Sequence, residues 1–316
     1  MLTYSAYTFR IASGFPIPAL EASGGWSADG ADVTVREVDR DAMAGRYREE
    51  RERPGGHLVV SHYDNEVHYA VRGGREIELY RSPGVAEDFM ARCVISLPLA
   101  IALRQRGLTT FHGCAVARDG VAVAFMGPSG AGKSTLAEAF YQRGYDVFSD
   151  DLFVLRFDGD TPVALPGPTH IRLREGSGRA LVDDYDRLPL AWSESAQRFR
   201  DVGDRPRRPA PLRRVYLVND ASAERTRVDP IDGLSATMTL AAQTWAYNRF
   251  SDPAYTTAHM DRLADLVTGG FVVGLLRVRG LDAIDETVRV VEADAGLAAP
   301  PEPTRRAGRR EVHAER

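Results

Sequence analysis

Lysine is almost absent from this sequence. The chain carries 40 lysine and arginine residues in total, and only one of them, Lys133, is a lysine. The preference for arginine is most simply an effect of GC-rich codons, so the bias by itself predicts no function. The exception is informative, because a chain that uses arginine everywhere else keeps an ammonium group at this one position.

Cysteine and long apolar runs are scarce as well. The two cysteines, Cys93 and Cys114, are too few for a disulfide framework or a zinc cage. The most apolar window, residues 93–103, is too short to span a bilayer. Residues 1–20 lack the basic start and the apolar run of a signal peptide. We therefore expect a protein of the reducing cytoplasm.

A large excess of charge is missing too. The formal net charge is −4, and neither nucleic acid nor an anionic membrane surface attracts an acidic protein over long range. We expect neither as a partner. With 44% hydrophobic and 27% charged residues, the 316-residue chain has the composition of an ordinary soluble protein of one large or two modest domains. The sequence leaves the oligomeric state open.

The first third of the chain reads as β-rich. Short segments of alternating apolar and polar residues are separated by Gly, Pro, Asp and Asn, which predicts strands. These segments cover residues 31–38, 57–63, 66–71 and 75–80. The charged stretch 41–56 is expected to be a solvated connector, and 84–106 a helix with a break near Pro98. We expect a smaller β-rich α+β domain over 1–105, whose sheet edges can dock an extended peptide.

Residues 106–295 follow a different pattern. The stretch 108–157 alternates strand, strand, helix, strand, strand, which predicts a mixed α/β sheet with a packed helix. Residues 158–212 are rich in Gly, Pro and Arg and are expected to be loop-like, with short elements at most. The pattern then predicts strands over 214–220 and 270–280, and helices over 233–247, 257–268 and 281–295. The tail, 296–316, is expected to be disordered.

The lone lysine lies in a phosphate-binding motif. The segment "GPSGAGKS" (127–134) fits G-x-x-x-x-G-K-[ST], between a strand pattern over 121–126 and a helix pattern from Lys133. Glycines let backbone N–H groups turn onto phosphates, Lys133 reaches the β- and γ-phosphates, and the Ser134 hydroxyl binds Mg²⁺. A slim ammonium fits beneath a phosphate chain where a planar guanidinium does not. The expected ATP-binding residues are Gly127, Ser129, Gly130, Ala131, Gly132, Lys133, Ser134 and Thr135.

Two carboxylates follow the predicted helix. Asp150 and Asp151 end the apolar run "YDVFS", and the gap after Ser134 fits one helix and one short strand. We expect this strand to lie beside the P-loop strand, with its end facing the phosphates. One carboxylate would hold Mg²⁺ and the other would accept a proton from an attacking hydroxyl. The pattern does not decide which, and the alternative is one metal-binding Asp beside an idle turn residue.

A histidine is predicted to approach the same phosphates. Asp119-Gly120 between two apolar runs indicates a hairpin with a two-residue loop. If Arg118 pairs with Val121, His112 lies opposite Gly127, the first residue of the P-loop. Further basic side chains are candidates to steady the transferring phosphoryl group, although with 39 arginines each is more simply a surface charge. They are His170, Arg172, Arg174 and Arg249.

These residues together resemble a known family. "FHGCAV", "GPSGAGKST" and "RGYDVFSDD" are similar, in order and spacing, to the core of the HPr kinase/phosphorylases. The resemblance implies a P-loop fold related to that of phosphoenolpyruvate carboxykinases. It also implies His112 beside the phosphates, Lys133 and Ser134 binding ATP and Mg²⁺, Asp150 as the base on an acceptor serine, and Asp151 serving the metal. The family's second signature and its C-terminal Pro-Gly-Arg-Asn turn are not found in this chain.

A resemblance over most of the chain is to the HPr-kinase-like proteins of peptide natural-product clusters, including lasso-peptide kinases. It rests on an opening like "YTFRIASGFPIPAL", on "LPLAIALRQRGLTTFHGCAV" and on the turn in "ALPGPTHIRL". Some members phosphorylate a serine of a precursor peptide. The expected function is a Mg²⁺/ATP-dependent kinase acting on a serine of a small peptide or protein. The alternatives are a small-molecule hydroxyl kinase, and a nucleotide-dependent switch without an acceptor.

Overall fold

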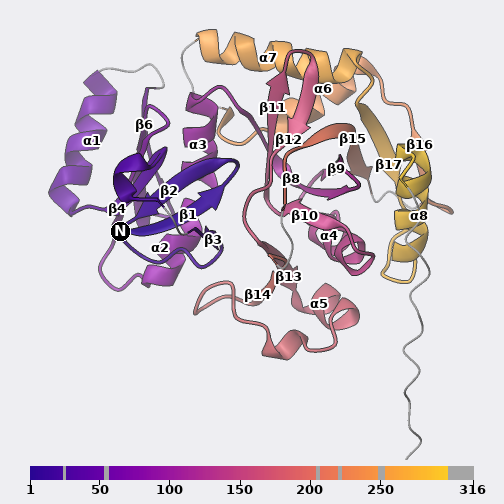
Figure 1. The fold of residues 1–316 in the computed structure, drawn as a ribbon, viewed down its shortest axis with the longest axis horizontal. Helices are drawn as coiled ribbons and strands as arrows, with labels where there is room; N and C mark the ends of the chain where they lie inside the picture. Colours follow the sequence, from indigo (N-terminus) through magenta and orange to yellow (C-terminus); the bar gives the residue numbers. More distant parts are fainter. Residues whose placement is uncertain (24–25, 53–56, 204–206, 220–222, 248–252, 298–316) are drawn as a thin grey trace, which may run out of the picture.

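The computed structural model describes residues 1–23, 26–52, 57–203, 207–219, 223–247 and 253–297 (Figure 1). Arg249 and residues 298–316 of the predicted tail lie outside this part. None of the helices in the described ranges combines the length and the apolar character that a membrane crossing requires.

The N-terminal part is built on a seven-stranded sheet with the order β3-β1-β2-β4-β7-β6-β5. Strand β4 runs parallel to both of its neighbours, and the other pairs are antiparallel. The strands predicted from alternation are β4 to β7, so these four predictions are confirmed. The strands are β1 (Leu2–Ala6), β2 (Phe9–Ser13), β3 (Glu21–Ala22), β4 (Val33–Glu37), β5 (Leu58–Tyr63), β6 (Val67–Arg72) and β7 (Glu76–Arg81); a 3-10 turn, η1, spans Ala28–Gly30.

The predicted connector at 41–56 is wrong over most of its length, because α1 (Arg40–Glu52) forms there. The charged residues of this stretch are mainly Arg and Glu, which have good helix propensity. Met43 and Tyr47, four residues apart, lie on the same face of the helix and pack on the sheet with Leu58 and Val60. Because α1 has so few apolar residues, its sequence shows only a weak helical periodicity.

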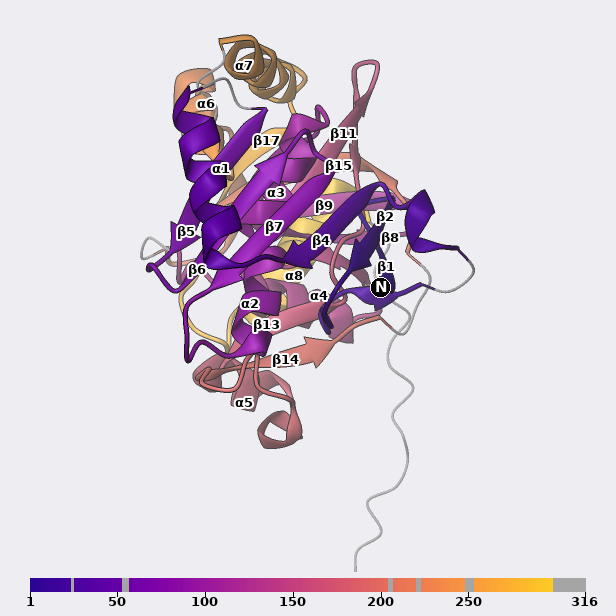
Figure 2. The same ribbon diagram turned by 90° about the vertical axis from the view of Figure 1, so that its left-hand side faces the viewer.

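The opposite face of this sheet is covered by α2 (Glu87–Val94) and α3 (Leu97–Gln105), with the predicted break just before Pro98 (Figures 1 and 2). Pro98 lies in the first turn of α3, where its missing N–H costs nothing. Helix α3 is buried between this sheet and β8 (Thr109–Arg118). Leu152 and Val154 of the second part belong to the same apolar core. A domain division near residue 105 stays a prediction, and the core is continuous across it.

The second sheet has eight strands, and five of them close into a ring: β8 pairs with β11, β11 with β12, β12 with β15, β15 with β9, and β9 with β8. Helices α4 and α8 pack on one apolar cluster and α6 and α7 on another. The further elements are β9 (Val121–Met126), α4 (Lys133–Gln142), β10 (Asp146–Ser149), β11 (Leu152–Asp158), β12 (Thr161–Ala164), β15 (Ala210–Asn219), β16 (Arg227–Asp229), α6 (Gly233–Ala242), α7 (Pro253–Thr268), β17 (Val272–Leu276) and α8 (Ile284–Ala295).

The segment 158–212 contains several short elements, as the sequence analysis allowed. After β12 come β13 (His170–Arg174), α5 (Glu175–Leu181), the 3-10 turn η2 (Tyr185–Arg187) and β14 (Gln197–Asp201). Strands β13 and β14 form a separate two-stranded sheet. Ile171 and Leu173 anchor it in the core beneath α4. Each of these elements is shorter than eight residues, so no periodicity is visible in the sequence.

One prediction about the sheet is wrong. Strand β10, which leads to the paired aspartates, does not lie beside the P-loop strand β9, because β8 lies between them and pairs with both. Both strands run antiparallel to β8, so they are parallel to each other and end at the same edge of the sheet. The aspartates therefore still face the P-loop.

Candidate active site

The P-loop joins β9 to α4. Gly132 is the residue before α4 and has a φ of 87°, in the left-handed region that favours glycine. At Gly127 a Cβ would lie 2.7 Å from the carbonyl oxygen of Val218, so only glycine fits the close approach of the loop to β15. No side chain caps α4, and its first turn holds no acidic residue. The N–H groups at this helix end can therefore bind an anion.

Lys133 is folded over the loop. Its Nζ donates to the carbonyl oxygens of Gly127 at 2.8 Å and Pro128 at 3.1 Å. The side chain is buried, and this burial lowers the pKa of Lys133, partly opposed by the nearby groups of Cys114 and Asp150. The ammonium group is therefore positioned at the mouth of the loop.

The β8–β9 hairpin brings His112 to the loop as predicted. Arg118 pairs with Val121 around the two-residue turn, and the ladder extends to Gly113 and Met126. The next residue along β8 is His112, across from the start of the P-loop. Its Nδ1 lies 3.0 Å from Asp151 Oδ1. The edge of its ring meets the Trp245 ring.

The two aspartates sit at a kink. Strands β10 and β11 pair with the same edge of β8, and Asp150 and Asp151 lie between the two ladders. Asp151 has a φ of 80°, a strained value for an aspartate. Its carbonyl accepts from the Trp245 indole N–H at 2.9 Å, and the Gly113 N–H points to the same oxygen. This kink turns two adjacent carboxylates into different surroundings.

Asp150 is linked to the P-loop. Its Oδ1 accepts from the Ser134 hydroxyl at 2.8 Å, and its Oδ2 accepts from the backbone N–H of Arg172 at 2.8 Å. Loss of solvent raises the pKa of Asp150, and this effect outweighs the charge and the N–H of Arg172. A carboxyl group with a raised pKa is suited to exchange a proton.

Asp151 is held by two basic groups. Besides His112, it contacts the Arg172 guanidinium, with Oδ2 at 3.2 Å from an Nη atom. Burial alone would raise the pKa of Asp151, but the His112 contact and the charge of Arg172 outweigh it and hold that pKa well below its usual range. Neighbouring carboxyl groups whose pKa values are pushed apart are typical of acid–base sites.

These groups meet in one cavity of about 460 Å³. It is lined by His112, by both aspartates and by most of the predicted ATP-binding residues. Two of the predicted residues, Gly127 and Ala131, belong to the loop but do not line the cavity. Of the weaker candidates, Arg172 and Arg174 reach the cavity, and an Nη atom of Arg174 lies 3.4 Å from Ser129 Oγ. His170 does not: its Nδ1 lies 3.3 Å from the Ala19 carbonyl oxygen, and burial lowers its pKa.

The sequence reasoning missed Arg277. Its buried side chain lies against the P-loop, and a Cβ on Gly132 would come within 2.6 Å of an Nη atom. A signal was present, because Arg277 directly follows β17. Strands β9, β15 and β17 are parallel, so they end at one edge of the sheet. Trp245, which contacts both His112 and Asp151, carried no comparable signal.

The residues present fit a Mg²⁺ ion bound together with a nucleotide. Within the described ranges, no group of three or more His, Cys, Asp or Glu side chains forms a metal cage. Magnesium needs no such cage when phosphates and water supply most ligands beside one or two carboxylates. The pair formed by the Ser134 hydroxyl and the Asp150 carboxylate provides that contribution at the start of α4. The predicted metal role of Asp151 stays a prediction, and its contacts with two basic groups do not favour it.

Comparison with known proteins adds little. No family model and no curated protein matches the chain. Among solved structures, the Hpr(Ser) kinase/phosphatase from Coxiella burnetii is similar over 58% of this chain and 89% of that chain, with 14% sequence identity and a TM-score of 0.32. A likeness at that TM-score is too weak to bear on the site, which rests on its own geometry.

Proposed function

We propose that this protein is a Mg²⁺- and ATP-dependent kinase that transfers the γ-phosphoryl group to a serine hydroxyl of a small peptide or protein. The observation that carries the proposal is the hydrogen bond between Ser134 of the P-loop and Asp150. It places a buried carboxyl group of raised pKa beside the residues suited to hold the nucleotide phosphates.

The transfer step follows from these positions. The acceptor oxygen forms a bond to the γ-phosphorus while the bond from that phosphorus to the β–γ bridging oxygen breaks, and ADP leaves. The acceptor proton passes to Asp150, whose oxygens each keep a lone pair beyond the hydrogen bonds they already accept. Lys133 and the N–H groups of α4 neutralise charge on the phosphates.

Asp151 is assigned a positioning role in this proposal. Its carboxylate, whose pKa is lowered, contacts His112 and Arg172 at the cavity wall, where Arg172 can steady the transferring group. When bound, Mg²⁺ would supply charge neutralisation and alignment of the phosphate oxygens. Ser134 would hold it, and Asp150, hydrogen-bonded to Ser134, keeps one oxygen for the acceptor proton.

The test follows radioactive phosphate from γ-labelled ATP. The purified protein is incubated with Mg²⁺, labelled ATP and host lysate, beside Lys133→Ala and Asp150→Asn variants. We expect label on a polypeptide serine with the wild type, and a loss of about 100-fold or more in each variant. Asp158→Asn is the matched control, because Asp158 is an exposed aspartate at the far end of β11.

The outcomes separate the kinase from its alternatives. Label found only in free phosphate, with Asp150→Asn as active as the wild type, would overturn the kinase and support a nucleotide-dependent switch. Label on a low-molecular-weight compound would support the second candidate, a small-molecule hydroxyl kinase. One observation favours that candidate: Arg174, Ser177 and Gln197, from the segment 158–212, wall the cavity, as a small acceptor would require.

A further inference from the structure

The aspartates are accessible from two sides. Besides the nucleotide cavity, they line a narrow second cleft between the N-terminal part and the β13–β14 hairpin. Asp150, Asp151 and Arg172 border both spaces, so these three residues form a wall between them. In phosphoryl transfer, the attacking oxygen and the leaving oxygen lie in line on opposite sides of the phosphorus. A nucleotide bound at the P-loop therefore leaves the second cleft as the approach for the acceptor.

The size of this cleft suits a hydroxyl group. Its volume is about 20 Å³, room for one water-sized group next to Asp150. Ile95, Pro168 and Phe199 supply the apolar part of its walls. A hydroxymethyl group can bring its oxygen to the carboxylate there, while the rest of the acceptor lies outside along α2 and the hairpin.

The N-terminal part closes the cleft with α2. Asp88 accepts hydrogen bonds from the backbone N–H and the hydroxyl of Ser193, at 2.7 and 3.2 Å. Phe89 meets the Trp192 ring edge-on, and the Arg92 guanidinium lies 5.3 Å from the centre of the same ring. In Figure 1, α2 lies beside the loop that extends from the hairpin. The acceptor side is therefore shared by both parts of the chain.

One of the two arginines that border the cleft is Arg92. It is half-buried and lines the cleft. Its charge helps to lower the pKa of Asp151, but among the described residues no carboxylate lies close enough to Arg92 to form a direct ion pair. Arg172, the other arginine there, is paired with Asp151. An arginine whose guanidinium lies over an aromatic ring and makes no direct ion pair is suited to bind a further carboxylate.

We propose that the cleft between α2 and the β13–β14 hairpin is the acceptor site, and that it takes a serine hydroxyl on an acidic peptide segment whose carboxylate binds Arg92. This inference rests on the proposed kinase function. It differs from the peptide addition at a sheet edge that the sequence predicted, which stays a prediction. At the edge strand β5, the backbone N–H of Val60 donates to Glu50 at 2.9 Å.

The experiment uses two synthetic peptides with the same central serine, one flanked by glutamates and the other by lysines. Label transfer from ATP and the affinity for a fluorescent ADP analogue are measured for the wild type and for Arg92→Gln, Arg92→Lys and Arg174→Gln. We expect the wild type to prefer the acidic peptide. Arg92→Gln should raise the acceptor KM about tenfold or more without changing ADP affinity, and Arg92→Lys should recover part of the loss.

The counterpart on the nucleotide side is Arg174→Gln, which should weaken ADP binding and leave the acceptor KM unchanged. Arg187→Gln, at a highly exposed arginine, is the control for loss of charge alone. Three results would overturn the inference. The first is an unchanged acceptor KM in Arg92→Gln, and the second is equal use of the two peptides. The third is transfer to neither peptide while a lysate protein is labelled. Absence of label on any polypeptide, with ADP still bound, would instead overturn the kinase function on which it rests.

Discussion

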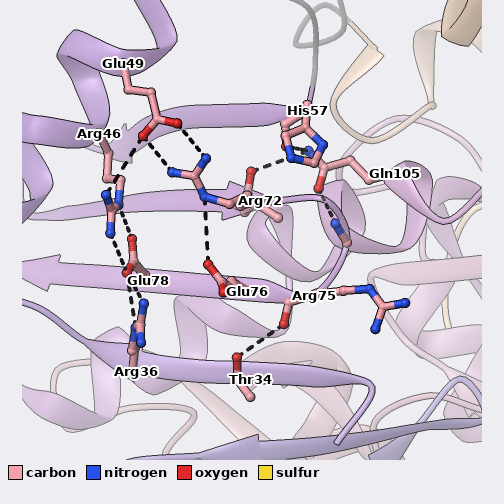
Figure 3. A network of polar contacts seen from close by, with 12 residues as sticks. Thr34, Arg36, Arg46, Glu49, His57, Arg72, Arg75, Glu76, Glu78 and Gln105 are labelled. Carbon is pink, nitrogen blue, oxygen red and sulfur yellow. Dashed lines mark hydrogen bonds and ion pairs between the residues drawn. The ribbon is translucent and has the colours of Figure 1, made fainter.

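Helices cover both faces of the N-terminal sheet, but the contacts that hold them are apolar on one face and largely charged on the other. On one face α3 packs a run of apolar side chains, Leu99 to Leu103, each at most 1% exposed. On the other face α1 is held mainly by ion pairs (Figure 3). There Glu78, only 3% exposed, accepts from Arg46 at 2.5 Å and from Arg36 at 2.6 Å, and Arg72 pairs with Glu49 at 2.6 Å.

The difference extends to packing and to the active site. Beside α1 an open surface pocket of about 450 Å³ is bordered by Met43, Tyr47 and His68. The α3 face has the continuous core and a polar route to the site: the buried Arg104 donates to the Trp245 carbonyl at 3.2 Å, and Trp245 donates to Asp151. Helix α3 therefore supports the residues of the site, whereas α1 lies at the periphery of the molecule.

The largest expected effect is on the α3 face. Leu103→Ala should lower the free energy of unfolding by about 2–5 kcal/mol, because it empties volume in a closely packed core. The matched change on the α1 face, Met43→Ala, should cost less, near the lower end of about 2–5 kcal/mol, since Met43 belongs to a small cluster beside an open pocket. Denaturant unfolding of both variants measures the difference. Equal losses would contradict the contrast between the two faces.

The second effect concerns the buried carboxylate of the α1 face. Hydrogen bonds from Arg46, and then from Arg36, hold the pKa of Glu78 below its usual range against the effect of burial. A carboxyl group with a lowered folded-state pKa stabilises the fold above its unfolded pKa, and this contribution is lost as pH falls through the folded value. Glu78→Gln should cost about 1–3 kcal/mol at neutral pH, discounted because both arginines are partly exposed.

Unfolding measured between neutral pH and about pH 3 checks this, because the gap between wild type and Glu78→Gln should close on acidification. Affinity for the ADP analogue at neutral pH should stay the same in the variant, as expected for a peripheral helix. A gap that persists in acid would mean that lost packing, and not charge, is responsible. A weakened nucleotide affinity would connect α1 to the site after all.

The contrast also explains what the sequence could predict. Strands β4 to β7 alternate apolar and polar residues and helix α3 carries an apolar run, so these local patterns located them. Helix α1 was missed because ion pairs with distant strands hold it, and partners such as Arg46 and Glu78 are 32 residues apart. Pairings at such separation have no local pattern for a sequence to show.

The candidate site divides in the same way. The P-loop and the hairpin that brings His112 to it were predictable, because each depends on residues close in sequence. The order of β8, β9 and β10 was not predictable. The sequence of the ten-residue strand β8 shows its hairpin partner β9, but it carries no pattern that indicates which strand pairs on its other side. The kink at Asp151 and the contacts of Trp245 depend on tertiary packing, and so the different surroundings of the two aspartates emerged only from the structure.

The smallest expected effect concerns an ion pair on the α1 face, and it shows whether charges there are screened as they are on an exposed surface. Glu49 and Arg72 form a two-pronged ion pair with their side chains about one-third exposed. A double-mutant cycle with Glu49→Ala and Arg72→Ala should give a coupling of about 0.5–1 kcal/mol that shrinks in high salt, because exposed pairs are screened. A larger coupling that is insensitive to salt would place this pair with the buried Glu78 instead. The α1 face would then behave like a buried region rather than a surface.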